Sequence, residues 1–162
     1  MSSGSRRILV VDDDPASCEL VAYFLKSLGY NVAIAADGRR ALNMNLDDDI
    51  ELVILDVHMP GYDGAEVLAM LRRRHLSRPV KFLALTADES TDARESMSRS
   101  GADGFLTKPV DLTALQGEVS RLVPGQSQNE GVLHRRVRER GAGIALSSRR
   151  VNPRAGLVRG DG

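Results

Sequence analysis

Residues 51–56 read ELVILD, and this short run is the strongest indication of the fold class. Four aliphatic residues in a row, at 52–55, are typical of a strand that is buried on both faces. A second run of this kind, ILVV at residues 8–11, is followed directly by three aspartates at 12–14. Strands buried on both faces occur in parallel sheets that helices cover on each side. Both runs therefore predict an α/β protein.

The chain alternates between strand and helix patterns up to residue 123. Further strands are predicted at 31–35, 80–85 and about 103–107. Helices are predicted at 15–28, about 38–46, 64 to about 72–74, about 89–99 and about 111–123, with a turn at 57–63. Five strand–helix pairs in strict alternation predict a doubly wound (βα)5 domain, in which helices cover both faces of a five-stranded parallel sheet.

Polar residues follow four of the predicted strands. Residues 12–14 are aspartates after the first strand, Asp56 ends the third, Thr86 ends the fourth and Lys108 follows the fifth. Doubly wound folds bind ligands beyond the carboxyl ends of their strands, where the strand order reverses. If the first, third, fourth and fifth strands are neighbours, these side chains meet in one pocket.

Such a carboxylate cluster requires compensating positive charge. Two unit charges about 4 Å apart repel by about 4 kcal/mol at an effective dielectric constant near 20. Magnesium suits the site, because it prefers oxygen ligands and recruits substrate phosphate. With metal bound, Asp56 is a candidate nucleophile toward phosphorus. Lys108 and the Thr86 hydroxyl can then meet the phosphoryl oxygens.

Each of these residues also has an ordinary structural interpretation. Asp14 precedes Pro15 and is better explained as a helix N-cap. Thr86 alone would be a strand-end hydroxyl, and Lys108 alone a solvated surface charge. The ordinary interpretation fails for the whole set, because chance would have to place acid, hydroxyl and ammonium groups at successive strand ends.

Four stretches resemble the motifs of receiver domains in two-component signalling. They are ILVVDDD at 8–14, LVILDVHMPGYDG at 52–64, LALTA at 83–87 and FLTKP at 105–109. The order and spacing also resemble that family, and the resemblance covers roughly residues 6–123. It implies a flavodoxin-like fold with strand order 2-1-3-4-5, together with a magnesium-dependent phosphoacceptor function.

The resemblance also implies roles for individual residues in the pocket. Asp56 matches the phosphoacceptor, which carries the aspartyl phosphate and also binds Mg²⁺. Asp13 matches a direct metal ligand, Asp12 a ligand acting through water, and the backbone carbonyl of His58 the remaining protein ligand. Lys108 matches the lysine of the phosphoryl site, whose bond to the following proline is typically cis in this fold.

A switch from the pocket to the surface is implied as well. Thr86 matches the switch hydroxyl and Phe105 the switch aromatic, which lacks a tyrosine hydroxyl here. His58 and Asp88 occupy two positions that tune dephosphorylation in the family. The helix at about 89–99 is unusually polar, with Ala93 and Met97 as nearly its only apolar contacts. Low local stability is therefore expected there, as in elements that move.

The resemblance implies a sensor histidine kinase or phosphotransfer protein as phosphodonor and an unknown downstream protein as target. Target binding, or homodimer formation, would use the face formed by the fourth helix, fifth strand and fifth helix. The protein is not expected to act on outside substrates. Alternatives are a phosphorylation-independent scaffold, a DNA-binding regulator, for which no further domain is recognisable, and a phosphatase, for which His58 replaces a second acid/base aspartate.

Charge divides the chain into two parts. Residues 1–123 carry 14 basic and 19 acidic residues, whereas residues 124–162 carry eight basic and three acidic ones. The Gly/Arg-rich segment 124–162 is predicted to be disordered, with a short helix near 130–140 as an alternative. Its charge suits nucleic acid or an acidic partner, but a functionless extension is an equal interpretation, and nucleic-acid binding is not the favoured prediction.

Two further expectations concern cysteine content and location. A lone Cys18 excludes an intramolecular disulfide framework and is interpreted as a small buried hydrophobic residue. No apolar run approaches the roughly 20 residues needed to span a membrane, and the first residues do not resemble a signal peptide. A cytoplasmic protein is therefore expected.

Overall fold

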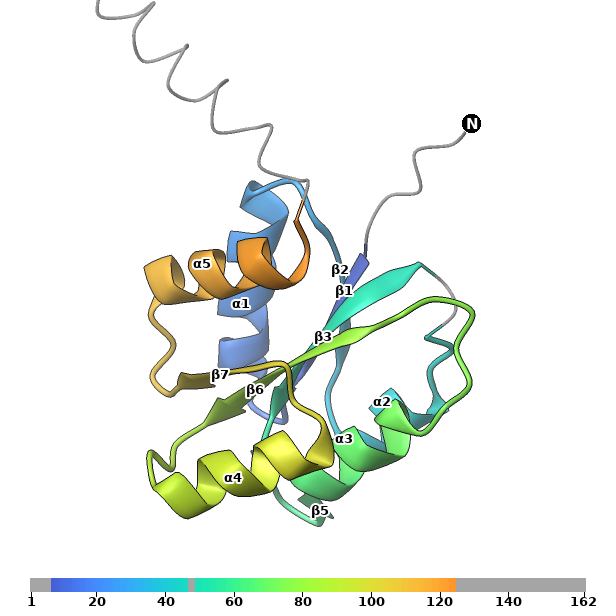
Figure 1. Ribbon diagram of the computed structural model, residues 1–162. Helices are drawn as coiled ribbons and strands as arrows, with labels where there is room; N and C mark the ends of the chain where they lie inside the picture. The colour runs from blue at the N-terminus through green and yellow to red at the C-terminus, as the bar shows by residue number, and fades with distance from the viewer. Residues whose placement is uncertain (1–6, 47–48, 125–162) are drawn as a thin grey trace, which may run out of the picture. The chain divides into compact units, whose positions relative to one another are not determined.

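Five parallel strands form the central sheet of the computed structural model, which describes residues 7–46 and 49–124 (Figure 1). They are β1 (Arg7–Val11), β2 (Asn31–Ala35), β3 (Ile50–Asp56), β6 (Lys81–Thr86) and β7 (Gly104–Thr107). Their spatial order is β2-β1-β3-β6-β7. Counted along the chain, these strands follow the order 2-1-3-4-5, which confirms the prediction.

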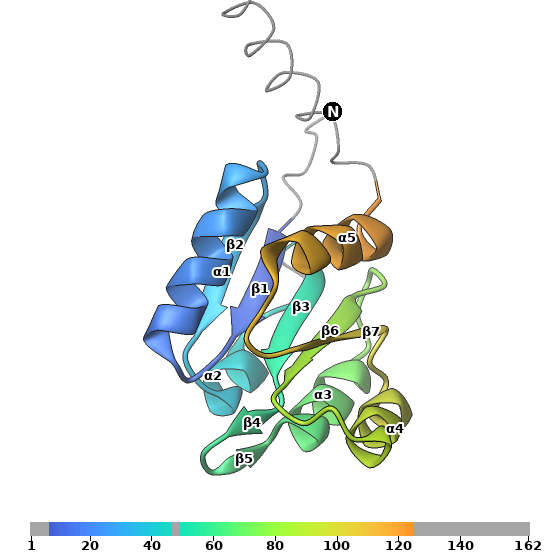
Figure 2. The same cartoon turned by 90° about the vertical axis from the view of Figure 1, so that its left-hand side faces the viewer.

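Helices cover both faces of this sheet (Figures 1 and 2). They are α1 (Pro15–Ser27), α2 (Gly38–Asn43), α3 (Gly64–Arg72), α4 (Thr91–Ser100) and α5 (Leu112–Leu122). On one face, α1 and α5 pack over a cluster that includes Ile8, Leu52 and Leu83. On the other face, α2 and α3 pack over a cluster that includes Leu9 and Val53. Neighbouring residues of one strand enter different clusters because side chains alternate across a sheet.

Each of the helices α1 to α5 begins at a capped N-terminus. The cap side chain accepts a hydrogen bond from a backbone N–H of the first turn in each case, and the five caps are Asp14, Asp37, Asp63, Ser90 and Asp111. Capping of this type stabilises a helix by about 1 kcal/mol. Because each helix runs antiparallel to its preceding strand, four carboxylates lie along the carboxyl edge of the sheet for structural reasons alone.

The structure differs from the prediction mainly between β3 and α3. The predicted turn at 57–63 contains a small antiparallel hairpin, β4 (His58–Met59) paired with β5 (Tyr62–Asp63). Gly61 lies at its tip with φ of 78°, a conformation that glycine adopts without a steric penalty. The helix predicted to end near residue 46 ends at Asn43, because Met44 is extended. The basic segment beyond residue 124 lies outside the described residues, so its predicted disorder stays a prediction.

Gly64 is a position where any side chain would strain the fold. A Cβ atom there would lie 2.5 Å from Val57 Cα and 2.6 Å from its carbonyl oxygen. We expect Gly64→Ala to lower the free energy of unfolding by about 2–3 kcal/mol, because backbone atoms must move. Gly117 in α5 has nothing within 4 Å of such a Cβ, so Gly117→Ala should instead stabilise by up to about 1 kcal/mol. Urea unfolding measures both, and equal stabilities of the two variants would contradict the packing described.

Candidate functional site

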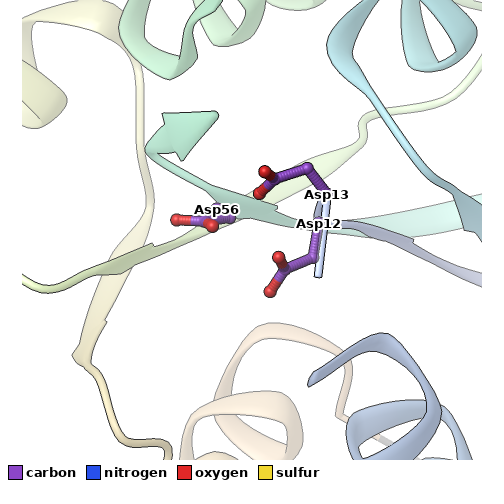
Figure 3. A group of neighbouring side chains, drawn as sticks. All are labelled: Asp12, Asp13 and Asp56. Carbon is purple, nitrogen blue, oxygen red and sulfur yellow. The ribbon is translucent and has the colours of Figure 1, made fainter. Parts of the chain in front are cut away.

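Three carboxylates converge at the carboxyl ends of β1 and β3 (Figure 3). Asp12 and Asp13 directly follow β1, and Asp56 ends β3, which pairs with β1 in parallel. One oxygen from each carboxylate lies within 4.8 Å of the other two. Asp12 and Asp56 are only 1% and 4% exposed, whereas Asp13 is exposed to solvent. The sequence prediction that these three residues meet is confirmed.

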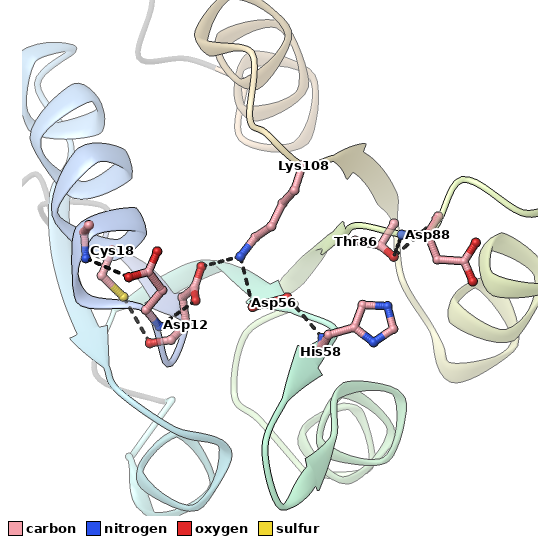
Figure 4. A network of polar contacts seen from close by, with 9 residues as sticks. Asp12, Cys18, Asp56, His58, Thr86, Asp88 and Lys108 are labelled. Atoms are coloured by element: carbon pink, nitrogen blue, oxygen red, sulfur yellow. Dashed lines mark hydrogen bonds and ion pairs between the residues drawn. The ribbon is translucent and has the colours of Figure 1, made fainter.

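Lys108 joins the two buried carboxylates (Figure 4). Its Nζ donates hydrogen bonds to Asp12 Oδ2 at 2.8 Å and to Asp56 Oδ2 at 3.0 Å. The second oxygen of each carboxylate accepts a backbone N–H, from Asp14 at 2.9 Å and from His58 at 3.0 Å. All four carboxylate oxygens thus have donors, which buried charges require. The Lys108–Pro109 peptide bond is cis, as the resemblance implied.

The pKa values of Asp12 and Asp56 shift in opposite directions, although both carboxylates bond to Lys108. Burial alone would raise the pKa of Asp12, but the hydrogen bonds from Lys108 and the Asp14 N–H outweigh it, so the pKa lies below its usual value. Burial dominates at Asp56 and raises its pKa despite the same lysine. Burial would lower the pKa of Lys108, but its hydrogen bonds to both carboxylates raise it. Lys108 is therefore a protonated cation near neutral pH.

Thr86 is buried at the end of β6, beside the carboxylate pocket. Its Oγ1 accepts the N–H of Asp88 at 3.0 Å and donates to the Asp88 carbonyl oxygen at 3.2 Å. Figure 4 shows this hydroxyl facing the Asp88 backbone. The structure thus brings Thr86 to the site on its predicted strand, with its hydroxyl held by the loop that leads to α4.

Phe105 lies on β7, half-buried between the sheet and α4. It packs against a small cluster formed by Val57, Ala84 and Met97. Met97 is the one buried residue of α4, which agrees with the polar character of this helix in the sequence. Phe105 therefore packs against a cluster that includes a residue of the loop after Asp56 and a residue of the helix that was predicted to be weakly held.

His58 and Asp88 lie at the exposed rim of the pocket. The hydrogen bond from the backbone N–H of Ser90, 2.8 Å long, lowers the pKa of Asp88, and the nearby His58 adds a smaller effect in the same direction. Figure 4 shows the His58 ring between Asp56 and Asp88. The hydrogen bond from the His58 backbone N–H to Asp56 was not predicted. The metal-binding role of the His58 backbone carbonyl stays a prediction.

The donor set fits a hard divalent cation. Asp12, Asp13 and Asp56 offer only carboxylate oxygens, which suit Mg²⁺ better than softer metals. Asp13 is open to solvent and to a hydrated ion, whereas the other two are buried. The residues present therefore fit the magnesium that the sequence predicts.

Cys18, on α1, contacts the backbone of Asp12, and the sequence did not predict this contact. Its Sγ lies 3.2 Å from the Asp12 carbonyl oxygen, and no local signal in the sequence reports this contact. Burial raises the pKa of the thiol to about 11.

This pKa predicts a native thiol that does not react. At pH 8 about one molecule in a thousand would carry the thiolate, the reactive form. We expect iodoacetamide to leave the folded protein unmodified over a period in which glutathione, as the control, reacts fully. Protein in urea should be alkylated once, as mass spectrometry would detect. Alkylation of the folded protein at the rate of glutathione would contradict the burial.

Comparison with known proteins shows the family to which the chain belongs. Residues 8–120 match the family model of the response regulator receiver domain. The match covers more than half of the chain, so the chain belongs to the response regulator receiver domain family. The predicted family is confirmed, and it defines a signalling domain of two-component systems.

Particular relatives agree with this assignment. The response regulator MprA of Mycolicibacterium vanbaalenii is 40% identical over 125 residues, covering 77% of this chain and 53% of that protein. The chain spans about half the length of the curated relatives it matches first. The chemotaxis protein CheY4 of Vibrio cholerae is 30% identical with a TM-score of 0.68, covering 73% of this chain and 98% of that one.

A third comparison involves a complex. The receiver domain of Ssk1 from Saccharomyces cerevisiae, crystallised with the histidine phosphotransfer protein Ypd1, is 26% identical. Its TM-score is 0.65, and the match covers 72% of this chain and 88% of that chain.

In the described part of this protein, no helix combines the length and apolarity needed to cross a membrane. A cytoplasmic location stays a prediction.

Proposed function

We propose that this protein accepts a phosphoryl group on Asp56 in a magnesium-dependent reaction and signals through a change at its α4–β7–α5 face. The observation that supports this most strongly is the buried Asp56 carboxylate, held 3.0 Å from Lys108 beside two further aspartates. A structural ion pair needs one carboxylate for each cation. Two buried carboxylates on one lysine, with a third acid open to solvent, suit a site that receives more positive charge.

The chemistry is transfer to a carboxylate oxygen. An oxygen of Asp56 forms a bond to phosphorus, while the bond from phosphorus to the donor, a phosphohistidine nitrogen, breaks and the donor keeps the electron pair. Asp13, Asp56 and the His58 carbonyl would hold Mg²⁺ directly, with Asp12 acting through water. When bound, Mg²⁺ supplies positive charge for the phosphoryl oxygens. Lys108 can exchange one carboxylate contact for a phosphoryl oxygen.

The signal would begin at Thr86. A phosphoryl group on Asp56 offers new acceptor oxygens to a hydroxyl that now bonds to the Asp88 backbone. If Thr86 turns toward the phosphoryl group, the loop leading to α4 loses its anchor and Phe105 can fill the vacated space. Since α4 buries only Met97 among its residues, little packing opposes its displacement. Phosphorylation would thus bias an equilibrium between two conformations.

The partners follow from this mechanism. A sensor histidine kinase or a phosphotransfer protein would supply the phosphoryl group, in the manner suggested by the crystallised pair of Ypd1 and Ssk1. The altered α4–β7–α5 face would bind a downstream protein or a second copy of the chain. The protein would catalyse only its own phosphorylation and dephosphorylation. A phosphorylation-independent scaffold has less support, because the acidic pair, acceptor and lysine are all in place.

Hydrogen exchange tests the proposal. Protein incubated with Mg²⁺ and acetyl phosphate should gain a phosphoryl increment by intact mass, and its exchange should change over residues 86–107. The region around β2 and α2 should stay unchanged as the internal control. Absence of the mass increment would contradict phosphoacceptor function. An increment with unchanged exchange over 86–107 would contradict the switch.

A further inference from the structure

A second concave site lies at the opposite, amino edge of the sheet, between the end of α3 and the start of β6. Figure 1 shows the segment that connects these two elements. This cleft has a volume of about 420 Å³, and its lining includes Arg72, Arg74, Arg78 and Lys81. Among the described residues that line the cleft, none is acidic. These four cations lie within residues 1–123, which carry more acidic than basic residues.

The carboxylates nearby neutralise only part of this charge. Arg72 and Lys81 share one carboxylate, Asp103, whose Oδ1 lies 3.3 and 3.9 Å from their nitrogens. Arg78 pairs with Asp49 at 3.3 Å, and both side chains are more than half exposed, so solvent screens this pair. Within residues 7–46 and 49–124, two carboxylates therefore face four cations.

Arg74 contributes one of the two excess positive charges. Its guanidinium donates to the backbone carbonyls of Leu42 and Met44, which fix its position without cancelling its charge. Among the described residues, none forms a carboxylate ion pair with Arg74. A guanidinium held in this way needs little reordering to bind an anion.

A structural role accounts for two of the four cations, Arg74 through the two carbonyls that it binds, and Arg72. Arg72 donates to the Val80 carbonyl at 2.8 Å and lies over the Phe82 ring, 5.3 Å from its centroid. It therefore ties α3 to β6. This role does not account for Arg78 and Lys81, whose side chains are 60% and 47% exposed and face the same cleft.

We propose that this cleft binds a small soluble polyanion that carries two or more phosphate groups, of the type of a nucleoside diphosphate. Guanidinium and ammonium groups are the usual partners of phosphate, and a concave site concentrates their field. Leu76 and Pro79 also line the cleft and give the organic part of such a ligand an apolar contact. The site is separate from the phosphoacceptor pocket, and the inference does not depend on the proposed function.

Inorganic pyrophosphate is the simplest probe. We expect it to cause saturable amide shifts over residues 71–82 in an NMR titration of the full chain, in metal-free buffer at constant ionic strength. The amide resonance of Asp103 should also shift, because the ligand competes with the Asp103 carboxylate for Arg72 and Lys81. Without metal, the acidic pocket repels the probe. In a second titration, ADP should bind more tightly than pyrophosphate, because its organic part contacts Leu76 and Pro79.

A pair of double variants decides the result. Arg78→Gln with Lys81→Gln should weaken pyrophosphate binding at least about tenfold, since each change removes a charge-assisted contact. Arg94→Gln with Arg99→Gln removes the same charge from the exposed side of α4 and should change affinity less than about twofold. Unsaturable or scattered shifts, shifts confined to the Asp56 pocket, or equal affinities in both variants would overturn the proposal. Dispersed amide spectra establish that each variant is folded.

Discussion

Asp56→Asn is expected to abolish the phosphoryl increment that the wild-type protein gains with Mg²⁺ and acetyl phosphate. An amide cannot form the acyl phosphate, so the expected loss is complete and not a reduction in rate. The variant should remain folded, because asparagine has the same shape and keeps one oxygen for Lys108 or the His58 N–H. Intact mass spectrometry measures the increment, and the far-ultraviolet circular dichroism spectrum checks the fold.

Asp111→Asn is the matched control for this experiment. Asp111 caps α5 through its side chain and belongs to the same acidic edge of the fold, and asparagine caps helices equally well. This variant should gain the full increment. If Asp56→Asn were phosphorylated to the same extent as Asp111→Asn, another residue would be the acceptor and the assignment of Asp56 would be wrong.

Lys108→Met is expected to lower the free energy of unfolding by roughly 2–3 kcal/mol at neutral pH. Removing one partner of a buried ion pair costs about 3–5 kcal/mol, because the remaining charge stays buried. A value below this range applies here because the Lys108 side chain is 22% exposed, although the side chains of its partners Asp12 and Asp56 are only 1% and 6% exposed. Lys81→Met is the control, since Lys81 is 47% exposed and 3.9 Å from Asp103, and it should cost less than about 1 kcal/mol.

The penalty for Lys108→Met should depend on pH in a defined direction. The lowered pKa of Asp12 stabilises the wild-type fold above the unfolded value of about 3.8, and this contribution is lost as pH falls through the folded pKa. The raised pKa of Asp56 has the opposite sign and destabilises the fold when pH rises above the unfolded value. Without Lys108 both carboxylates would favour protonation. The difference between variant and wild type should therefore shrink on acidification.

Urea unfolding at several pH values measures this dependence. Added Mg²⁺ should also reduce the penalty at neutral pH, because it supplies positive charge to the same carboxylates. A penalty that stays constant from pH 7 to pH 4, with no effect of Mg²⁺, would show that Lys108 acts through packing and not through its charge.

The sequence predicts the sheet well because its strands carry a strong local signal. The apolar runs at 8–11 and 52–55 are too short and too uniform for surface helices, and both are strands in the structure. The polar helix α4 was also predicted, over about residues 89–99, and in the structure it is capped by Ser90 and Gly101. The β4–β5 hairpin was missed because strands of two residues have no measurable periodicity.

The candidate site was predictable in its membership but not in its contacts. Parallel strands align their carboxyl ends, so Asp12, Asp56 and Lys108 could be placed together from their positions alone. The bond from Lys108 to Asp12 joins residues 96 positions apart, and it depends on side-chain conformations that no local pattern encodes. The same holds for Thr86, whose bond to Asp88 needs the shape of the loop after β6.

The most direct test of the central claim is to locate the phosphoryl group and its metal requirement together. Protein treated with acetyl phosphate would be reduced with borohydride, which converts an aspartyl phosphate to homoserine, and then digested and sequenced by mass spectrometry. We predict homoserine at position 56, formed with Mg²⁺ and absent when the metal is chelated. Modification at another aspartate, or equal modification at position 56 without divalent metal, would contradict the account.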